Sequence, residues 1–105
     1  MISVYHLWQL FGGECFYCGV TTWVEGHESH AGAKARLGLV KARDLRNRRA
    51  TREHLQRRAD DGGNDLSNLV LACNLCNGAR DTTPVLLHLA RRRSGEGLRT
   101  VWGDV

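Results

Sequence analysis

One short stretch of the chain carries several side chains that could act together on a charged substrate. Glu53 and His54 are adjacent, Asn68 follows His54 by 14 residues, and Asn77 follows it by 23. A histidine side chain titrates near neutral pH and can accept a proton, while carboxylate and amide oxygens suit a hard divalent cation. Hydrolysis of a phosphodiester bond requires this combination of proton acceptor and cation site, so it is the chemistry we expect of this stretch.

The four cysteines form two pairs, each with two residues between the sulfurs: Cys15 with Cys18, and Cys73 with Cys76. This spacing lets two thiolates from one tight turn reach a single tetrahedral ion at about 2.3 Å. Two disulfides are the alternative, but a cytoplasmic chain keeps its thiols reduced. A thioredoxin-like redox motif does not fit, because there are two such pairs and neither begins a βαβ pattern. We therefore predict a structural Zn²⁺ held by all four thiolates, with no open coordination position.

The distance between the two cysteine pairs defines the role of this predicted zinc. In the 105-residue chain, 54 residues lie between Cys18 and Cys73, whereas a compact zinc ribbon separates its pairs by about 15–20. The zinc would close a long loop and fix the segment that follows Cys73. A single domain of this size has a thin hydrophobic core and benefits from such a staple.

Basic residues are concentrated around and before His54. The whole chain has a net charge of +4, but residues 34–58 contain ten basic and two acidic residues, a net charge of +8. Thirteen of the 15 basic residues are arginines, which bind phosphate in a planar, bidentate way. A solvated helix face would have a similar composition, but the position of this segment beside His54 favours contact with nucleic acid.

No part of the sequence indicates a membrane protein. The longest apolar runs are far shorter than the roughly 20 residues that cross a bilayer. The first residues also lack the basic-then-apolar order of a signal peptide. We expect a cytoplasmic location with reduced thiols and no membrane contact. Because no sequence-reading module is recognisable, we expect either weak sequence specificity or an unidentified protein partner that supplies it.

The expected secondary structure places the candidate residues on two strands and a helix. Residues 50–55 and 69–72 are predicted strands, joined by a loop rich in turn residues, and residues 74–81 are a predicted helix. Around this core we expect a helix at 4–11 capped by Ser3, a knuckle with a hairpin strand at 15–25, a helix at 84–93 begun by Pro84, and a tail at 94–105. Residues 33–47 form either a basic helix or an insertion that lies over nucleic acid. The predicted fold class is α+β, with a small zinc-stapled ββα core and flanking helices.

Residues 53–80, together with the cysteine pairs, resemble the HNH endonucleases, whose core is the ββα-metal fold. The matching pattern is Glu53-His54, then Gly62-Gly63, then Asn68-Leu69-Val70, then Cys73-x-x-Cys76-Asn77-x-x-Arg80. Asn77 stands where many members have His, so this is the HNN type. Glu53 and Arg80 stand where Asp and Lys are commoner. None of these changes removes a chemical group that the reaction needs.

The resemblance implies a metal-dependent endonuclease that hydrolyses phosphodiester bonds, with double-stranded DNA as the expected substrate. His54 would be the general base, and Glu53 and Asn77 would hold one divalent cation, Mg²⁺ or a related ion, as Lewis acid. Asn68 would brace the loop between the strands, and Arg80 would bind phosphate charge in the transition state. A single HNH domain would span residues 1–105, with its ββα core at about 50–82, its knuckle at 15–18 and its last helix at about 84–93.

Several alternatives stay open at this point. Neighbouring side chains of a regular strand point to opposite faces, so Glu53 and His54 cannot both face one site unless the strand ends or distorts there. Asp81, one turn beyond Asn77, is therefore the rival cation ligand. His27 and His30 are spaced as a possible second metal pair. For the whole chain, the alternatives are a non-catalytic zinc-stabilised nucleic-acid-binding module and a protein-interaction zinc domain, which the arginine clustering disfavours.

Overall fold

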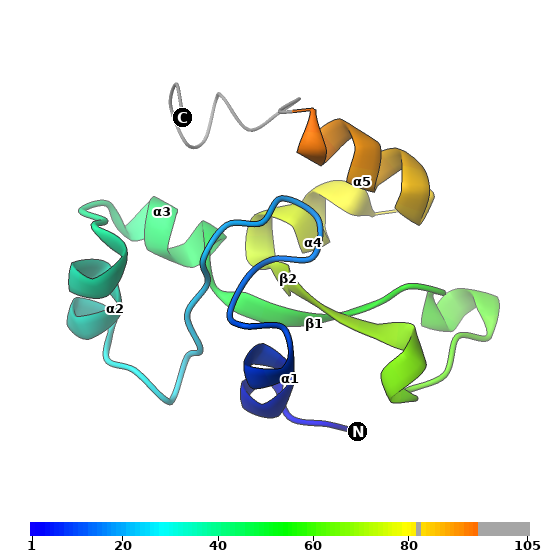
Figure 1. The fold of residues 1–105 in the computed structure, drawn as a ribbon, viewed down its shortest axis with the longest axis horizontal. Helices are drawn as coiled ribbons and strands as arrows, with labels where there is room; N and C mark the ends of the chain where they lie inside the picture. The colour runs from blue at the N-terminus through cyan, green and yellow to red at the C-terminus, as the bar shows by residue number, and fades with distance from the viewer. Residues whose placement is uncertain (82, 95–105) are drawn as a thin grey trace.

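The computed structural model describes residues 1–81 and 83–94, and its centre is an antiparallel β-hairpin followed by a helix (Figure 1). β1 (Ala50–His54) pairs with β2 (Leu69–Cys73), with Ala50 opposite Cys73 and His54 opposite Leu69. β2 continues directly into α4 (Asn74–Arg80). This order confirms the predicted α+β fold with a ββα core.

The remaining elements surround this core. They are α1 (Val4–Leu10), α2 (His30–Leu37), α3 (Ala42–Asn47), α5 (Val85–Arg93) and two short 3-10 helices, η1 (Arg58–Asp60) and η2 (Leu66–Asn68). α1 and α4 lie on opposite sides of the hairpin, and both contact β1 and β2 (Figure 1). α2 and α3 lie at the end where β1 begins, while η1 and η2 belong to the loop at its other end (Figure 1).

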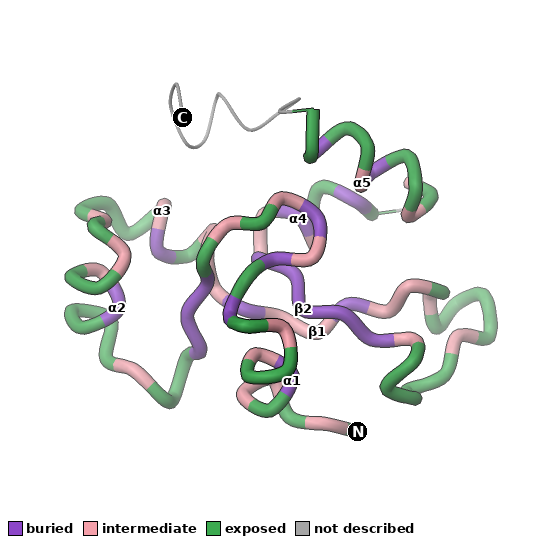
Figure 2. Tube along the Cα trace, viewed as in Figure 1, coloured by how far each residue is buried: buried purple, intermediate pink, exposed green. Residues whose placement is uncertain are grey.

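β2 is buried along its whole length, which accounts for its continuous apolar sequence (Figure 2). Leu69 and Leu71 pack against α1, whereas Val70 and Ala72 pack on the cysteine-rich side that includes Cys76. This alternation is the period-two pattern of a strand. β2 therefore divides the core into two apolar clusters, one on the side of α1 and one on the side of α4.

Residues 33–47, for which the sequence offers one basic helix or an insertion, belong to two helices rather than one. α2 ends at Gly38, which has a φ of +68°, a left-handed conformation that glycine adopts without steric cost. α3 then begins after Lys41. Ala33 and Leu45 are buried together with Trp23, so the two helices fold back on a shared apolar contact instead of continuing as one rod.

The knuckle also differs in part from the expectation. The sequence predicts a knuckle and a hairpin strand over residues 15–25, but only the knuckle forms. Trp23 pairs with Arg49 in an isolated bridge, and the N–H of Phe16 donates to the carbonyl of Leu71 at 2.8 Å. The knuckle is thus attached to the edge of β2, and its own two arms meet in an isolated antiparallel bridge between Glu14 and Thr21 without forming strands.

The predicted terminal helices are present with small shifts. Ser3 caps α1, and its hydroxyl accepts a hydrogen bond from the N–H of His6 at 3.1 Å. α5 begins at Val85 with Pro84 as its N-cap, one residue later than predicted. Apart from Ser94, the predicted tail lies outside the described residues. Among the helices of the described residues, none has the length and apolar character needed to span a bilayer.

Candidate active site and metal centre

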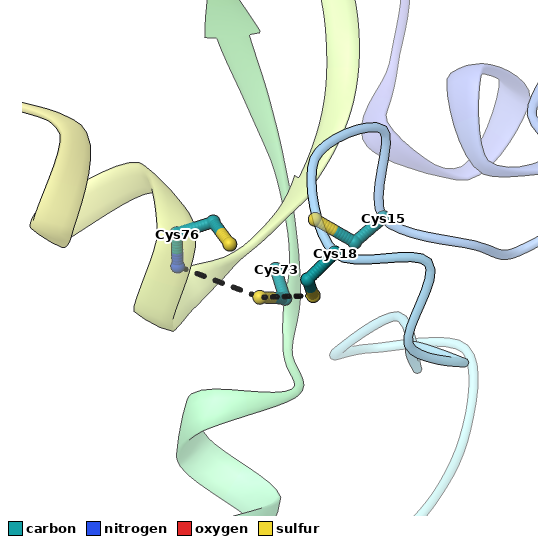
Figure 3. Close-up of side chains that lie close together, drawn as sticks. All are labelled: Cys15, Cys18, Cys73 and Cys76. Atoms are coloured by element: carbon teal, nitrogen blue, oxygen red, sulfur yellow. Dashed lines mark hydrogen bonds between the residues drawn. The ribbon is translucent and has the colours of Figure 1, made fainter. Parts of the chain in front are cut away.

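The four cysteine sulfurs gather in one cluster, all within 4.8 Å of one another. Cys15 and Cys18 come from the knuckle, and Cys73 and Cys76 from the junction of β2 and α4 (Figure 3). The sulfurs of Cys18 and Cys73 are 3.8 Å apart, which matches the edge of a tetrahedron whose corners lie about 2.3 Å from a central ion. All four cysteines are free of disulfides. The cluster could bind a metal ion and has the geometry of a zinc site.

The electrostatics of the cluster also fit a bound dication. Hydrogen bonds from the other three thiols, that of Cys18 first, lower the pKa of Cys15 far below its ordinary value. Hydrogen bonding to Cys15 is the largest cause that raises the pKa of Cys73 and of Cys76, and burial adds to it. One buried thiolate therefore opposes ionisation of the next, because like charges repel in a low dielectric. A divalent cation removes this conflict and allows all four sulfurs to bind as thiolates.

Cys73 links the cluster to the helix that carries the candidate active-site residues. It is the N-cap of α4, and its Sγ accepts a hydrogen bond from the N–H of Cys76 at 3.4 Å (Figure 3). Asn77 follows Cys76 directly. A metal bound to the thiols would therefore fix the first turn of α4 and, with it, the position of Asn77.

A groove of about 330 Å³ opens along the edge of β1 where this strand ends. Its lining comes from three parts of the chain: Arg52, Glu53 and His54 of β1; Arg57 and Arg58 at the start of η1; and Asn77, Gly78, Arg80 and Asp81 of α4 and its C-cap. The groove thus brings together five of the residues singled out from the sequence: Glu53, His54, Asn77, Arg80 and Asp81.

Glu53 and His54 leave β1 on opposite faces, as expected for a regular strand. Glu53 lies opposite Val70, on the side of α4, and its Oε1 is 3.4 Å from Nη1 of Arg80. His54 is the last residue of the strand, and its ring lies beside Asn64 of the following loop. Both residues nevertheless line the groove.

Asn64 sets the tautomer of His54. Nε2 of the ring is 2.8 Å from Oδ1 of Asn64, and because an amide oxygen only accepts, Nε2 must carry the proton. Nδ1 is then the nitrogen that can accept a proton. From the sequence, Asn64 is simply a turn residue, because a side chain ten positions away in a loop has no periodic relation to His54.

Arg80 is buried, and its guanidinium contacts the interior of the protein. Nη1 donates to the carbonyl of His54 at 2.8 Å, and Nη2 donates to that of Leu55 at 2.9 Å. Nε donates to the carbonyl of Thr83 at 3.0 Å. Only 5% of the residue is exposed. This geometry favours a role in bracing the end of β1 over the phosphate contact that the resemblance implies.

Glu53 is a buried carboxylate with one oxygen unpaired. The residue is 6% exposed, and its Oε2 has no hydrogen-bond partner among residues 1–81 and 83–94. Burial raises the pKa of Glu53 above its ordinary value, although Tyr17 and Arg80 oppose the shift. Burial and the neighbouring Glu53 likewise raise the pKa of Tyr17. An unpaired carboxylate oxygen at the wall of a groove is costly, and a cation would satisfy it.

Asn77 is held by β1. Its Nδ2 donates to Oγ1 of Thr51 at 2.9 Å and approaches the carbonyl of Arg52 at 3.4 Å. The hydroxyl of Thr51 in turn donates to the carbonyl of Ala72 at 2.7 Å. These bonds fix the amide of Asn77 and leave its Oδ1 without a hydrogen bond within the described part of the chain.

Asn68 does not line the groove but braces the loop between the strands. Its Oδ1 accepts a hydrogen bond from the N–H of Gln56 at 2.8 Å. Its Nδ2 donates to the carbonyl of Gln56 at 3.0 Å and to that of Gly63 at 2.7 Å. Asn68 thus ties the two ends of the loop together through backbone groups.

The oxygens of Glu53 and Asn77 fit a divalent cation such as Mg²⁺. Both residues line the groove, and oxygen donors suit a hard cation. Mg²⁺ commonly uses one or two protein ligands and takes the rest from water and substrate phosphate. Asp81 offers another carboxylate in the same groove and has a φ of +44°, so it remains the alternative ligand.

The spacing of His27 and His30 does not produce a metal site. The ring of His27 stacks on Tyr5 with centroids 4.1 Å apart, whereas Nε2 of His30 lies 3.6 Å from a carboxylate oxygen of Glu25. Across residues 1–81 and 83–94, the thiol cluster is the one group of three or more His, Cys, Asp or Glu side chains close enough to share an ion.

The positive charge of residues 34–58 is partly neutralised by acidic residues that lie outside this segment. Arg36 pairs with Glu28 at 2.6 Å, and Arg49 pairs with Glu25 at 3.2 Å. Arg57 pairs with Asp60 at 3.0 Å. The net charge of +8 counted along residues 34–58 therefore overstates the positive charge that this surface presents.

A comparison with known proteins agrees with this arrangement. The family model described as HNH endonuclease matches residues 41–82, which include α3, the hairpin and α4. No curated protein and no solved structure matches the chain. The matched segment carries the ββα unit, two of the four clustered cysteines and the groove residues from β1 to Asp81. Residues 41–82 of this chain therefore resemble an HNH endonuclease domain, which suggests a nuclease or another nucleic-acid-related function.

Proposed function

We propose that this protein is a metal-dependent endonuclease that hydrolyses phosphodiester bonds in double-stranded DNA. The observation that carries the proposal is the convergence of a histidine, a buried carboxylate and a helix amide on one groove rich in arginine. The family match supplies the nucleic-acid substrate class. A merely folded domain has no need of an unpaired carboxylate oxygen in such a groove.

In this proposal His54 is the general base. Its Nδ1 accepts a proton from the water that attacks phosphorus, while Nε2 stays hydrogen-bonded to Asn64. Arg80 holds the carbonyl of His54, which limits movement of the ring during proton transfer. Asn68 keeps the loop after His54 in place through its bonds to Gln56 and Gly63.

Glu53 and Asn77 would hold the divalent cation through Oε2 and Oδ1. When bound, such an ion acts as a Lewis acid that stabilises charge on the phosphate and on the departing 3′ oxygen. Thr51 orients the amide of Asn77, and Arg80 keeps the carboxylate of Glu53 at the groove. These contacts preset both ligands for one ion.

The thiol cluster has a separate, structural role in this proposal. Four thiolates fill every position of a tetrahedral Zn²⁺, so that ion has no open position for substrate. It would join the knuckle to α4 within a single functional unit over residues 1–105. A reducing compartment such as the cytoplasm keeps the thiols available for zinc.

Plasmid cleavage across Mg²⁺, Mn²⁺ and Ni²⁺ tests the proposal. We expect cleavage that EDTA abolishes, and a loss of about 10²–10⁴-fold in His54→Ala with an unchanged circular dichroism spectrum. His27→Ala, a histidine outside the groove, is the matched control. A His54→Ala variant that cleaves as fast as the parent would remove the general base from this mechanism.

Two further variants identify the carboxylate ligand. Glu53→Gln should raise the cation concentration needed for half-maximal cleavage, whereas Asp81→Asn should leave it unchanged; the reverse result would assign the ligand to Asp81. Tight, salt-sensitive binding of DNA without cleavage under any cation would instead make the protein a zinc-stabilised binding module.

A further inference from the structure

The groove contains four arginines, and three of them already have partners inside the protein. Arg80 contacts three backbone carbonyls and Glu53. Nη1 of Arg52 donates to the carbonyl of Ile2 at 2.8 Å, and Nε of Arg57 donates to the carboxylate of Asp60 at 3.0 Å. A ligand would therefore compete with existing partners for the guanidinium groups of these three arginines.

Arg58 is the exception. It lines the groove at the start of η1 and is exposed. Its guanidinium has no hydrogen-bond or ion-pair partner among residues 1–81 and 83–94. A planar guanidinium can bind two phosphate oxygens at once. Arg58 is therefore the groove arginine best placed to meet a phosphate without first breaking an internal contact.

The turn that carries Arg58 is closely held despite its exposed position. Nε2 of Gln56 donates to the carbonyl of Asp60 at 2.6 Å, and the N–H of Gly62 donates to the carbonyl of Arg57 at 2.9 Å. Gln56 is in turn bonded through both of its backbone groups to the amide of Asn68. The position of Arg58 thus depends on Asn68 through one intermediate residue.

Gly62 shows how tightly this turn is folded. A Cβ at this position would overlap the carbonyl oxygen of Gln56, whereas a Cβ at Gly63 would have its nearest neighbour at 3.7 Å. Any side chain at residue 62 must therefore push the turn open. The sequence requires glycine at 62 for the same geometry that displays Arg58.

We propose that Arg58 binds the nucleic-acid phosphate that enters the groove beside His54, and that Asn68 is a positioning residue that holds the Arg58 turn. This inference rests on the proposed function for the presence of nucleic acid in the groove. It transfers the phosphate contact from Arg80, which is buried, to Arg58, which is exposed.

Binding of a short duplex oligonucleotide in the non-cleaving His54→Ala background tests the role of Arg58. In a potassium chloride series followed by fluorescence anisotropy, Arg58→Ala should weaken binding by about tenfold and reduce the slope of log affinity against log salt by about 0.9, the loss of one phosphate contact. Arg58→Lys should keep the slope but recover only part of the affinity. Arg91→Ala, an exposed arginine of α5 outside the groove, is the matched control. An Arg58→Ala variant with the affinity and slope of Arg91→Ala would overturn the inference.

A double-mutant cycle tests the role of Asn68. Asn68→Ala should lower the salt slope as Arg58→Ala does, and adding Arg58→Ala to it should cause little further loss. Fully additive losses would show that Asn68 does not act through Arg58. If Asn68→Ala does not fold, Gly62→Ala compared with Gly63→Ala applies the same test to the turn.

The outcomes separate this inference from the proposed function. Cleavage by the parent together with unaltered binding by Arg58→Ala would reject the Arg58 contact and leave the nuclease. Weakened binding by Arg58→Ala, with no cleavage by the parent under any cation, would keep the contact and reject the nuclease.

Discussion

The thiol cluster and the groove occupy successive turns of α4, yet they are built in different ways. The cluster joins cysteine pairs separated by 54 residues and is largely buried. The groove is lined by the end of β1, the start of η1 and α4, and its side chains are positioned by hydrogen bonds to both side chains and backbone carbonyls. The cluster fixes where α4 begins, and the groove uses the residues that α4 then presents. The residues that stabilise the fold and the residues expected to contact a substrate are therefore largely different. Arg80 and Glu53 are the exceptions, because they are buried and also line the groove.

The largest effect should come from breaking the cluster. Cys73→Ser removes a thiolate and changes the cap of α4, so we expect loss of the folded state; a structural zinc contributes about 10 kcal/mol or more in small zinc peptides. Circular dichroism melts and zinc content measure this. Chelation of zinc from the parent should unfold it equally, with no rescue by Mg²⁺. A folded, zinc-free variant would show that the groove side is stable by itself.

Arg80→Ala tests the residue that belongs to both regions. The change leaves the buried Glu53 carboxylate without its charged partner and the carbonyls of His54 and Leu55 without their donor, at a cost of about 3–5 kcal/mol. Urea denaturation measures this loss. Arg80→Lys should recover only part of it, because an ammonium cannot reproduce the forked contacts. The control Arg91→Ala should change stability by less than about 0.5 kcal/mol, and equal stability of the two alanine variants would remove the bracing role.

Gly62→Ala tests the turn beside the groove without altering a residue of the thiol cluster. Overpacking at this position should cost about 1–3 kcal/mol and reduce DNA binding, with zinc content unchanged. Gly63→Ala, where a Cβ has room, should keep binding near the parent level. Similar binding by the two variants would mean that the turn adapts to the added methyl group and that its geometry is not needed.

The smallest effect concerns His88, which packs behind the knuckle. Its ring meets Tyr17 edge-on at 4.7 Å. Burial first, and then the charges of Arg92 and Arg80, lower the pKa of His88 below its ordinary value. The folded state therefore prefers the neutral ring, so stability is full above the unfolded pKa of about 6.5 and declines as the pH falls through and below it.

Urea denaturation of the parent and of His88→Phe over a pH series isolates this contribution, because thiol protonation affects both proteins alike. The free energy of unfolding of the parent should fall more steeply below neutral pH than that of the variant. Parallel curves would contradict the assignment.

Much of the fold could be predicted because its signals are local. The apolar run of β2, the turn residues before it and the spacing of the cysteines each predict one element or contact, and the structure confirms the α+β class and the clustered thiols. The break at Gly38 also had a local signal, since glycine commonly ends a helix. The absence of the predicted hairpin strand had no local signal in the sequence, because it reflects a hydrogen bond from Phe16 to a strand more than 50 residues away.

The candidate site was less predictable because side-chain partners depend on tertiary structure. The contact of Asn64 with His54 and the engagement of Arg80 by backbone carbonyls leave no periodic pattern in the sequence. Charge counted along a segment also misses acidic partners from elsewhere, as with Glu25 and Glu28. Sequence patterns identified the residue types, and the roles we now propose for Arg58 and Arg80 come from their contacts.

The dual position of Cys73, as cluster member and as cap of α4, has a consequence for the newly made protein. Until Cys76 leaves the ribosome, the knuckle has at most three of its four sulfur partners and α4 has no anchored start. A truncated product that ends before this point contains His54 but lacks Asn77. Translation order alone would therefore prevent an unfinished copy from completing the groove that we propose acts on nucleic acid.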